Sequence, residues 1–170
     1  MKHLVATVLL LVVVSISTSA LAQSDSDKAA AESLFQEGKT LLDEGKFLEA
    51  AKKFRASQGL DPGIGTLLYT ADAFEKAGKL ASAWANFREA QALAQQAGQQ
   101  KRTIVAKDRA DKLEPRLSKL KLEVGENQKI KGFQLKRNDE KVADVLWGSS
   151  TPVDSGSYQL EASAPGHETW

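Results

Sequence analysis

The stretch Gly45–Gln58, GKFLEAAKKFRASQ, is echoed thirty-three residues later by Gly78–Gln91, GKLASAWANFREAQ. At this offset the two stretches share a glycine, a lysine, a small apolar residue and a phenylalanine. Glycine takes the left-handed conformation that ends many helices, so Gly45 and Gly78 predict two helix ends. The apolar residues that follow each glycine have helical spacing. We interpret the echo as two copies of one unit, each made of two packed helices.

The echo extends on both sides of the quoted stretch. The superposed pairs are Leu34 with Leu67, Gly38 with Ala71, Leu41 with Phe74, Phe47 with Leu80, Ala50 with Ala83, Phe54 with Phe87 and Arg55 with Arg88. Small residues at matched positions predict where the two helices of a unit cross closely, and the large apolar residues fill the space beside them. An ordinary helical bundle with a chance echo is the alternative.

This pattern resembles the tetratricopeptide repeat. Counted from Ala31, the family's small residues, turn glycine, aromatic residues and proline fall on Gly38, Gly45, Phe47, Ala50, Phe54 and Pro62. The second unit departs from the pattern, because Ala71 replaces the first glycine and no proline closes it. The resemblance implies an α-α superhelix with repeats at about residues 31–63 and 64–96.

Two repeat units need a cover for their last apolar face. The segment 100–116 is the expected capping helix, with Ile104, Val105 and Leu113 directed toward the second unit. The helical domain is therefore expected to span residues 23–116.

The first residues have the three regions of a secretory signal peptide. Lys2 is followed by the apolar run Leu4–Val14 and then by small residues up to Ala22, after which cleavage is expected. The apolar run is too short to span a membrane. We therefore expect residues 1–22 to be a leader and the protein to be exported, to the periplasm or cell envelope.

The pattern changes to period two in residues 117–170, as in half-buried strands. Asn138-Asp139 is a predicted hairpin turn. The order of Thr151-Pro152, Ser155-Gly156, an alternating strand and Pro165-Gly166 resembles the PEGA family of small bacterial β-sandwich domains. The expected fold class is thus α+β, with the helical repeats followed by a small β-sandwich, either complete or lacking its closing strand.

The composition argues against most kinds of chemistry. The chain has no cysteine and two histidines, of which only His167 lies after the expected leader. Zinc sites and cysteine or histidine nucleophile pairs need more such residues, so we expect no catalytic, metal or cofactor site. Without Lys2, 22 of the 23 basic residues remain against 22 acidic ones. This balance does not suggest a nucleic-acid partner.

The resemblance places a binding groove on the first helix of each repeat. The family's groove positions fall on Phe35, Lys39, Leu42, Asp43, Leu68, Asp72, Glu75 and Lys76. Apolar residues mixed with both charge signs suit a protein or peptide partner. We therefore expect a non-enzymatic, exported scaffold or adaptor of a bacterial envelope.

Two alternatives stay open. One is a structural envelope protein whose β-module binds polysaccharide or peptidoglycan. The other is the N-terminal part of a longer multidomain protein that continues beyond Trp170.

Overall fold

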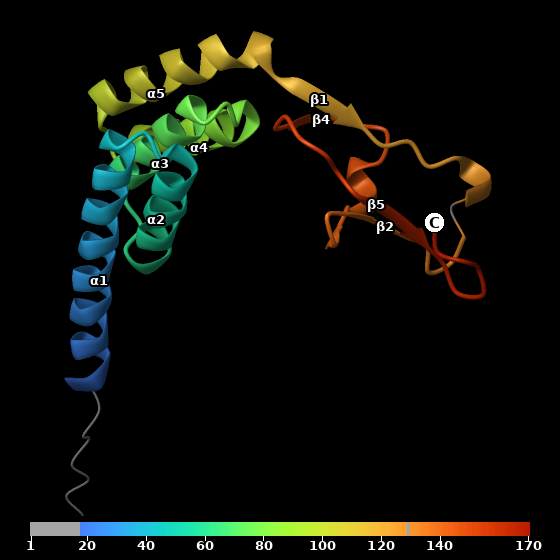
Figure 1. The fold of residues 1–170 in the computed structure, drawn as a ribbon, viewed down its shortest axis with the longest axis horizontal. Helices are drawn as coiled ribbons and strands as arrows, with labels where there is room; N and C mark the ends of the chain where they lie inside the picture. Colours follow the sequence, from blue (N-terminus) through green and yellow to red (C-terminus); the bar gives the residue numbers. More distant parts are fainter. Residues whose placement is uncertain (1–17, 129) are drawn as a thin grey trace, which may run out of the picture.

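The fold begins with helices and ends with strands. The computed structural model describes residues 18–128 and 130–170. Its five α-helices are α1 (Thr18–Asp43), α2 (Phe47–Leu60), α3 (Ile64–Lys76), α4 (Leu80–Gln96) and α5 (Gln100–Leu113). Antiparallel strands in two small sheets follow the helices (Figure 1). The predicted fold class, α+β with an N-terminal helical part, is therefore confirmed.

The expected signal peptide, residues 1–22, lies mainly outside the described residues, which begin with α1 at Thr18. It stays a prediction. In the part of the chain that the structure describes, no helix combines the length and apolar character that crossing a membrane requires.

The five helices pack in succession, each against the next one along the chain, as in a helical repeat. Most of the buried apolar residues of this part are alanines: Ala31, Ala50, Ala51, Ala71, Ala73, Ala81, Ala83, Ala90, Ala94, Ala106 and Ala110. Phe54, Phe87 and Leu113 are the largest apolar side chains that are fully buried. Helix axes approach more closely where the side chains at the contact are small, so the interior is thin and densely filled.

Helices α1, α3 and α4 end in the same hydrogen-bonded turn. The glycine of each turn has a positive φ, +76° at Gly45, +73° at Gly78 and +66° at Gly98. The amide after each glycine donates to a carbonyl five residues earlier: Lys46 to Leu41 and Lys79 to Phe74 at 2.9 Å, and Gln99 to Ala94 at 2.8 Å. This bond satisfies a carbonyl that the helix end would leave free. The two predicted turn glycines are confirmed, and Gly98 is a third.

Gly38 lies where α2 crosses α1, and the ring of Phe54 packs directly against its backbone. A Cβ at this position would lie 2.6 Å from Cε1 and 2.7 Å from Cδ1 of that ring, closer than real contacts allow. Phe54 is 0% exposed, so its ring has no free space to move into. The crossing therefore requires a residue without a side chain.

Helix α5 covers the second helix pair with a different face from the one expected. Ala106, Ala110 and Leu113 are buried, whereas Ile104 and Val105 are 57% and 52% exposed. The prediction that Ile104 and Val105 face the second unit is therefore wrong. Ala110 and Leu113 join Ala71 in one apolar cluster, and these small contacts bring α5 close to α3 and α4.

The strands after the helices form a two-stranded and a three-stranded sheet. In the first, β1 (Ser118–Lys121) pairs with β4 (Ser150–Val153). In the second, β2 (Gln134–Arg137) lies between β3 (Glu140–Lys141) and β5 (Leu160–Ser163). Asn138 and Asp139 have φ of 49° and 65° and join β2 to β3, so the predicted hairpin turn is confirmed.

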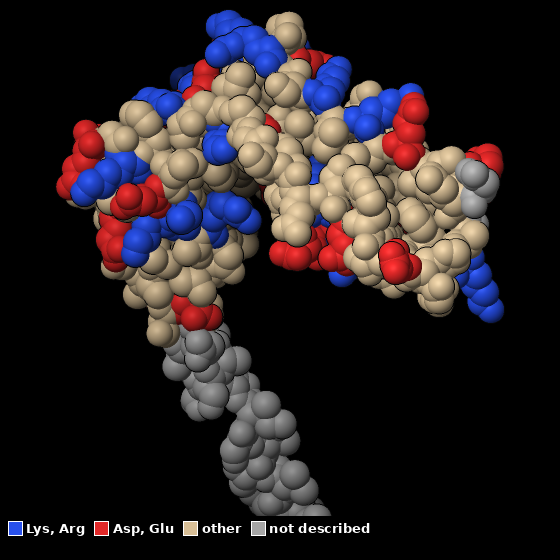
Figure 2. All heavy atoms as spheres, turned by 45° about the vertical axis from the view of Figure 1, so that its right-hand side comes forward, with Lys and Arg blue, Asp and Glu red and all other residues tan. Residues whose placement is uncertain are grey.

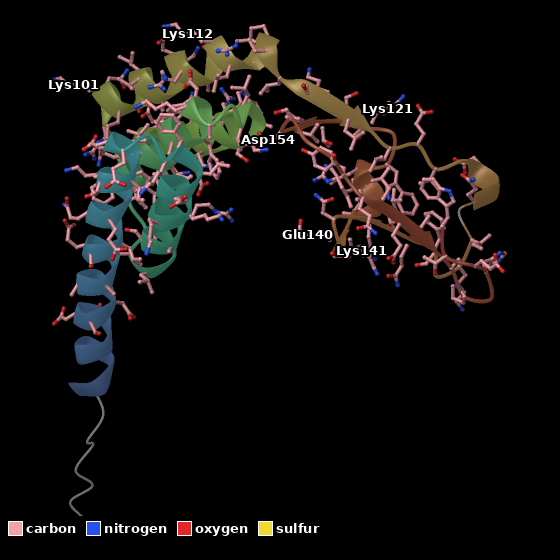
Figure 3. The ribbon with its side chains drawn as sticks, in the orientation of Figure 1. Lys101, Lys112, Lys121, Glu140, Lys141 and Asp154 are labelled. Atoms are coloured by element: carbon pink, nitrogen blue, oxygen red, sulfur yellow. The ribbon has the colours of Figure 1, made fainter. Side chains whose placement is uncertain are left out.

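One side chain joins the sheets to the helices. Asp154, directly after β4, points to the first turn of α4 (Figure 3). Its Oδ1 accepts hydrogen bonds from the backbone amides of Ala81 at 2.9 Å and Ser82 at 3.1 Å, and its Oδ2 accepts one from Ser82 Oγ at 2.6 Å. Lys79, the N-cap residue of α4, makes no capping bond with its side chain. Asp154 therefore caps α4 from a distant part of the chain.

Gly38→Ala should lower the free energy of unfolding by about 1–3 kcal/mol, because the new methyl group overlaps the Phe54 ring. Urea denaturation of the helical transition measures the change. Gly59→Ala is the matched control, since a Cβ there meets nothing within 4 Å and Gly59 lies within α2. The control should be neutral or stabilising by up to about 1 kcal/mol. Equal losses in both variants would contradict the close crossing.

Asp154→Ala should destabilise the chain by about 0.5–2 kcal/mol and speed hydrogen exchange at the amides of Ala81 and Ser82, since both lose their acceptor. Asp144→Ala, on another loop of the sheet region, should leave both amides unchanged. A double-mutant cycle with Ser82→Ala isolates the side-chain bond. Unchanged exchange in Asp154→Ala would show that the cap does not form in solution.

Candidate functional site

The eight residues predicted for a binding groove lie on two neighbouring helices. Phe35, Lys39, Leu42 and Asp43 are on α1, and Leu68, Asp72, Glu75 and Lys76 are on α3. The rings of Phe35 on α1 and Tyr69 on α3 meet edge to face, with centroids 5.1 Å apart. We call the surface formed by these eight positions the α1–α3 face.

The apolar members of the α1–α3 face are mostly used for packing. Phe35 is half-buried, with its ring 5.4 Å from that of Phe54. Leu42 packs on the cluster around Phe54, and Leu68 packs on the clusters around Phe87 and Leu67. Each can still offer an edge to a partner, but none is a free apolar anchor.

Arg109 of α5 holds the acidic residues of α3. Its Nη2 donates to Asp72 Oδ1 at 2.9 Å and to Glu75 Oε2 at 2.6 Å, and its Nε donates to Glu75 Oε2 at 3.2 Å. The guanidinium carbon also lies 4.7 Å from the ring centroid of Phe87, within the range of a cation–π contact. Two of the predicted groove residues are therefore occupied by a bond between helices.

The charges in this cluster reinforce one another. Partial burial raises the pKa of Asp72, but its hydrogen bonds to Arg109 and Lys76 outweigh burial, and the pKa lies below its ordinary value. Burial lowers the pKa of Arg109, while its bonds to Asp72 and Glu75 raise it, with a net increase. Lys76 Nζ lies 3.0 Å from Asp72 Oδ2 and completes the cluster. The charged forms are thus the stable ones at neutral pH.

Lys39 and Asp43 differ from the other charged positions of the α1–α3 face. Asp43 is exposed and Lys39 is half-buried. Although they are four residues apart on α1, neither forms an ion pair with a described residue. They are the predicted groove charges that an incoming partner could bind without breaking an internal bond.

A second candidate site lies in the sheet region. A hollow of about 420 Å³ opens between the two sheets, lined mainly by apolar residues, among them Leu122, Phe133, Leu160 and Trp170. Trp170 is 78% exposed. Figure 2 shows a broad uncharged surface over this region, whereas charges of both signs are mixed over the helices. The hollow has the apolar character of a binding site, and sequence reasoning did not identify it.

The described residues contain no group of three or more His, Asp or Glu side chains that could hold a metal ion. His167, the histidine considered for chemistry, is exposed and lines a second hollow of about 250 Å³ beside Trp170 and Glu168.

The sequence matches no protein-family model and no curated protein in comparisons with both. The site must therefore be judged from its own residues.

Sequence reasoning missed Arg109 and Asp154, the two side chains that tie distant elements together. Arg109 is one of several basic residues on α5, among them Lys101 and Lys112, which lie on the outer side of that helix (Figure 3). Nothing in the sequence separates Arg109 from them. The helical spacing of Arg109 relative to Ala106 and Ala110 was the available signal, but it required knowing that alanines form the buried face.

Arg109→Gln should lower the free energy of unfolding by about 1–2 kcal/mol at pH 7, because it leaves Asp72 and Glu75 without their main partner in a half-buried cluster. The folded-state pKa of Asp72 is lowered, so the bonded carboxylate stabilises the protein above the unfolded-state pKa of about 4. This stabilisation is lost as the pH falls through the folded-state pKa. The difference between Arg109→Gln and the unaltered chain should therefore shrink at acid pH, as measured by urea denaturation from pH 7 to pH 2.5.

Lys107→Gln is the matched control, since Lys107 pairs with Asp111 on the exposed side of α5. It should change the stability by less than about 0.5 kcal/mol. A pH-independent loss in Arg109→Gln would contradict the charge cluster.

Proposed function

We propose that this chain is a non-enzymatic, exported scaffold or adaptor that binds a protein or peptide partner on the α1–α3 face. The helices are interpreted as tetratricopeptide-type hairpins with a capping helix, and the sheet region as a PEGA-type module. Its place of action is then the periplasm or envelope of a bacterium, as the leader predicts.

The observation that carries the proposal is the pair of unbonded, opposite charges on α1, Lys39 and Asp43. They lie on the helix surface beside the half-buried ring of Phe35. A peptide with complementary charges could bind them while covering the exposed edge of this ring. Rim charges of this kind set the orientation and the association rate, and the aromatic edge adds apolar contact.

The internal bonds of the cluster at Arg109 refine the proposed binding surface. Asp72 and Glu75 support the position of α3, so their contribution to a partner is indirect. The partner is expected to read mainly α1 and the exposed end of α3, where Lys76 lies.

One observation favours a second function. Trp170 is largely exposed and lines a hollow together with the polar residues Gln128, His167 and Glu168. An exposed aromatic face beside polar groups could hold a polysaccharide such as peptidoglycan, as in the structural alternative. Trp170→Ala would then abolish retention of the chain on insoluble peptidoglycan, whereas Lys39→Glu would not.

The binding proposal is tested by crosslinking in intact cells that export the protein, with a photoreactive residue replacing Asp43. Lys39→Glu should lower the yield of a defined crosslinked partner by roughly tenfold, because it reverses a charge at the contact. Lys101→Glu is the matched control, since it reverses one charge on the outer side of α5 and should leave the yield unchanged. Equal yields from both variants would show that the α1–α3 face is not the binding surface.

A further inference from the structure

Strand β5 is bonded to β2 on one edge and largely open on the other. The backbone amide of Asn138 donates to the carbonyl of Gln159 at 2.9 Å, and the pairing continues from Arg137↔Leu160 to Gln134↔Ser163. Hydrogen-bonded pairs alternate along an antiparallel ladder. Leu160 and Ala162 therefore direct their backbone N–H and C=O groups away from β2.

Trp170 marks the line of a neighbouring strand on this open edge. Its carbonyl accepts from the amide of Ala162 at 2.8 Å, and its amide donates to the carbonyl of Ala162 at 3.0 Å. This mutual exchange is the hydrogen-bonded pair of an antiparallel ladder. The outward backbone groups of Leu160, one step further along, bond to no other described backbone group. The edge is thus set for an antiparallel strand but holds only one of its residues.

The hollow of about 420 Å³ lies beside the same edge, and Leu160, Ala162 and Trp170 all line it. Residues that lie opposite each other on neighbouring strands project from the same face of a sheet. A residue opposite Leu160 would therefore project its side chain into this hollow, as Trp170 does opposite Ala162.

The lining of the hollow defines the chemistry of that side chain. Its described charged residues are Lys121 and Glu123, which pair with each other at 2.5 Å. The other lining residues include Leu122, Val124 and Leu135. An uncharged apolar side chain fits this lining, and a charged one would lose its hydration without gaining a partner.

From this geometry we propose that the open edge of β5 binds an extended segment of a partner protein, antiparallel to β5, with an apolar side chain opposite Leu160. Backbone hydrogen bonds supply the affinity, and the hollow supplies the selectivity for apolar residues at alternate positions. This site is separate from the α1–α3 face, so it stands whether or not that face binds a partner.

The first experiment appends Thr-Val-Thr-Val after Trp170 in the full chain, which places the first valine opposite Leu160. Tethering makes even a weak contact measurable. The exchange of the Leu160 amide should slow by roughly tenfold and the unfolding temperature should rise. Thr-Asp-Thr-Asp is the matched control and should protect the amide little, because its first aspartate would enter the apolar hollow. Equal exchange with both extensions overturns the proposal.

The second experiment adds the free blocked peptide acetyl-Thr-Val-Thr-Val-Thr-amide to the chain without an extension. NMR should show a saturable shift of the Leu160 amide, which is lost in the chain extended by Thr-Val-Thr-Val because its edge is occupied. The same peptide with N-methylated valines should not bind, since it cannot donate the ladder bonds. Binding of the N-methylated peptide overturns the strand geometry. Protection of Leu160 that rises with protein concentration in the absence of peptide would assign the edge to a second copy and overturn a partner strand.

Discussion

The closest constraint in the molecule is the contact between the Phe54 ring and the backbone of α1 at Gly38. Because a Cβ cannot fit there, α1 and α2 approach more closely than two ordinary helices do. The second helix pair repeats the arrangement with Ala71 and Phe87 in one cluster, where a methyl group is accommodated. The buried alanines of the other crossings extend this close packing to α5. The helical part therefore depends on the absence of side-chain volume as much as on apolar area.

Close packing also decides which charges remain available at the surface. Since α5 lies against α3 through alanines, Arg109 reaches Asp72 and Glu75, and three charges become part of the internal structure. On α1 no helix approaches Lys39 and Asp43 in the same way. The same helix positions thus have a structural role in one unit and a potential recognition role in the other. This difference could not be inferred from matched positions alone.

The parts of the fold that could be predicted from sequence are those coded by a few adjacent or evenly spaced residues. Gly45, Gly78 and the Asn138-Asp139 turn have conformations that few other residues adopt, so their roles are visible locally. The buried face of α5 was assigned wrongly, because size suggested Ile104 and Val105 whereas a close crossing selects the alanines.

The candidate site was predictable only as a set of helix positions. Which of those side chains are free depends on contacts across the fold, and Arg109 reaches α3 over 37 positions of sequence from Asp72. No periodic pattern carries such a contact. The open edge of β5 likewise depends on the pairing of Trp170 with Ala162, which is a property of the folded sheet.

The cap of α4 by Asp154 has a consequence for the order in which the chain acquires structure. The carboxylate and the amide of Ala81 are 73 positions apart, so α4 leaves the ribosome long before its cap exists. During synthesis the helices must form with the first turn of α4 open to water, and the strands complete it when they arrive. A translocation machine that threads unfolded chains would meet the helical part in this looser state. The last-made region of the protein thus finishes the part made first.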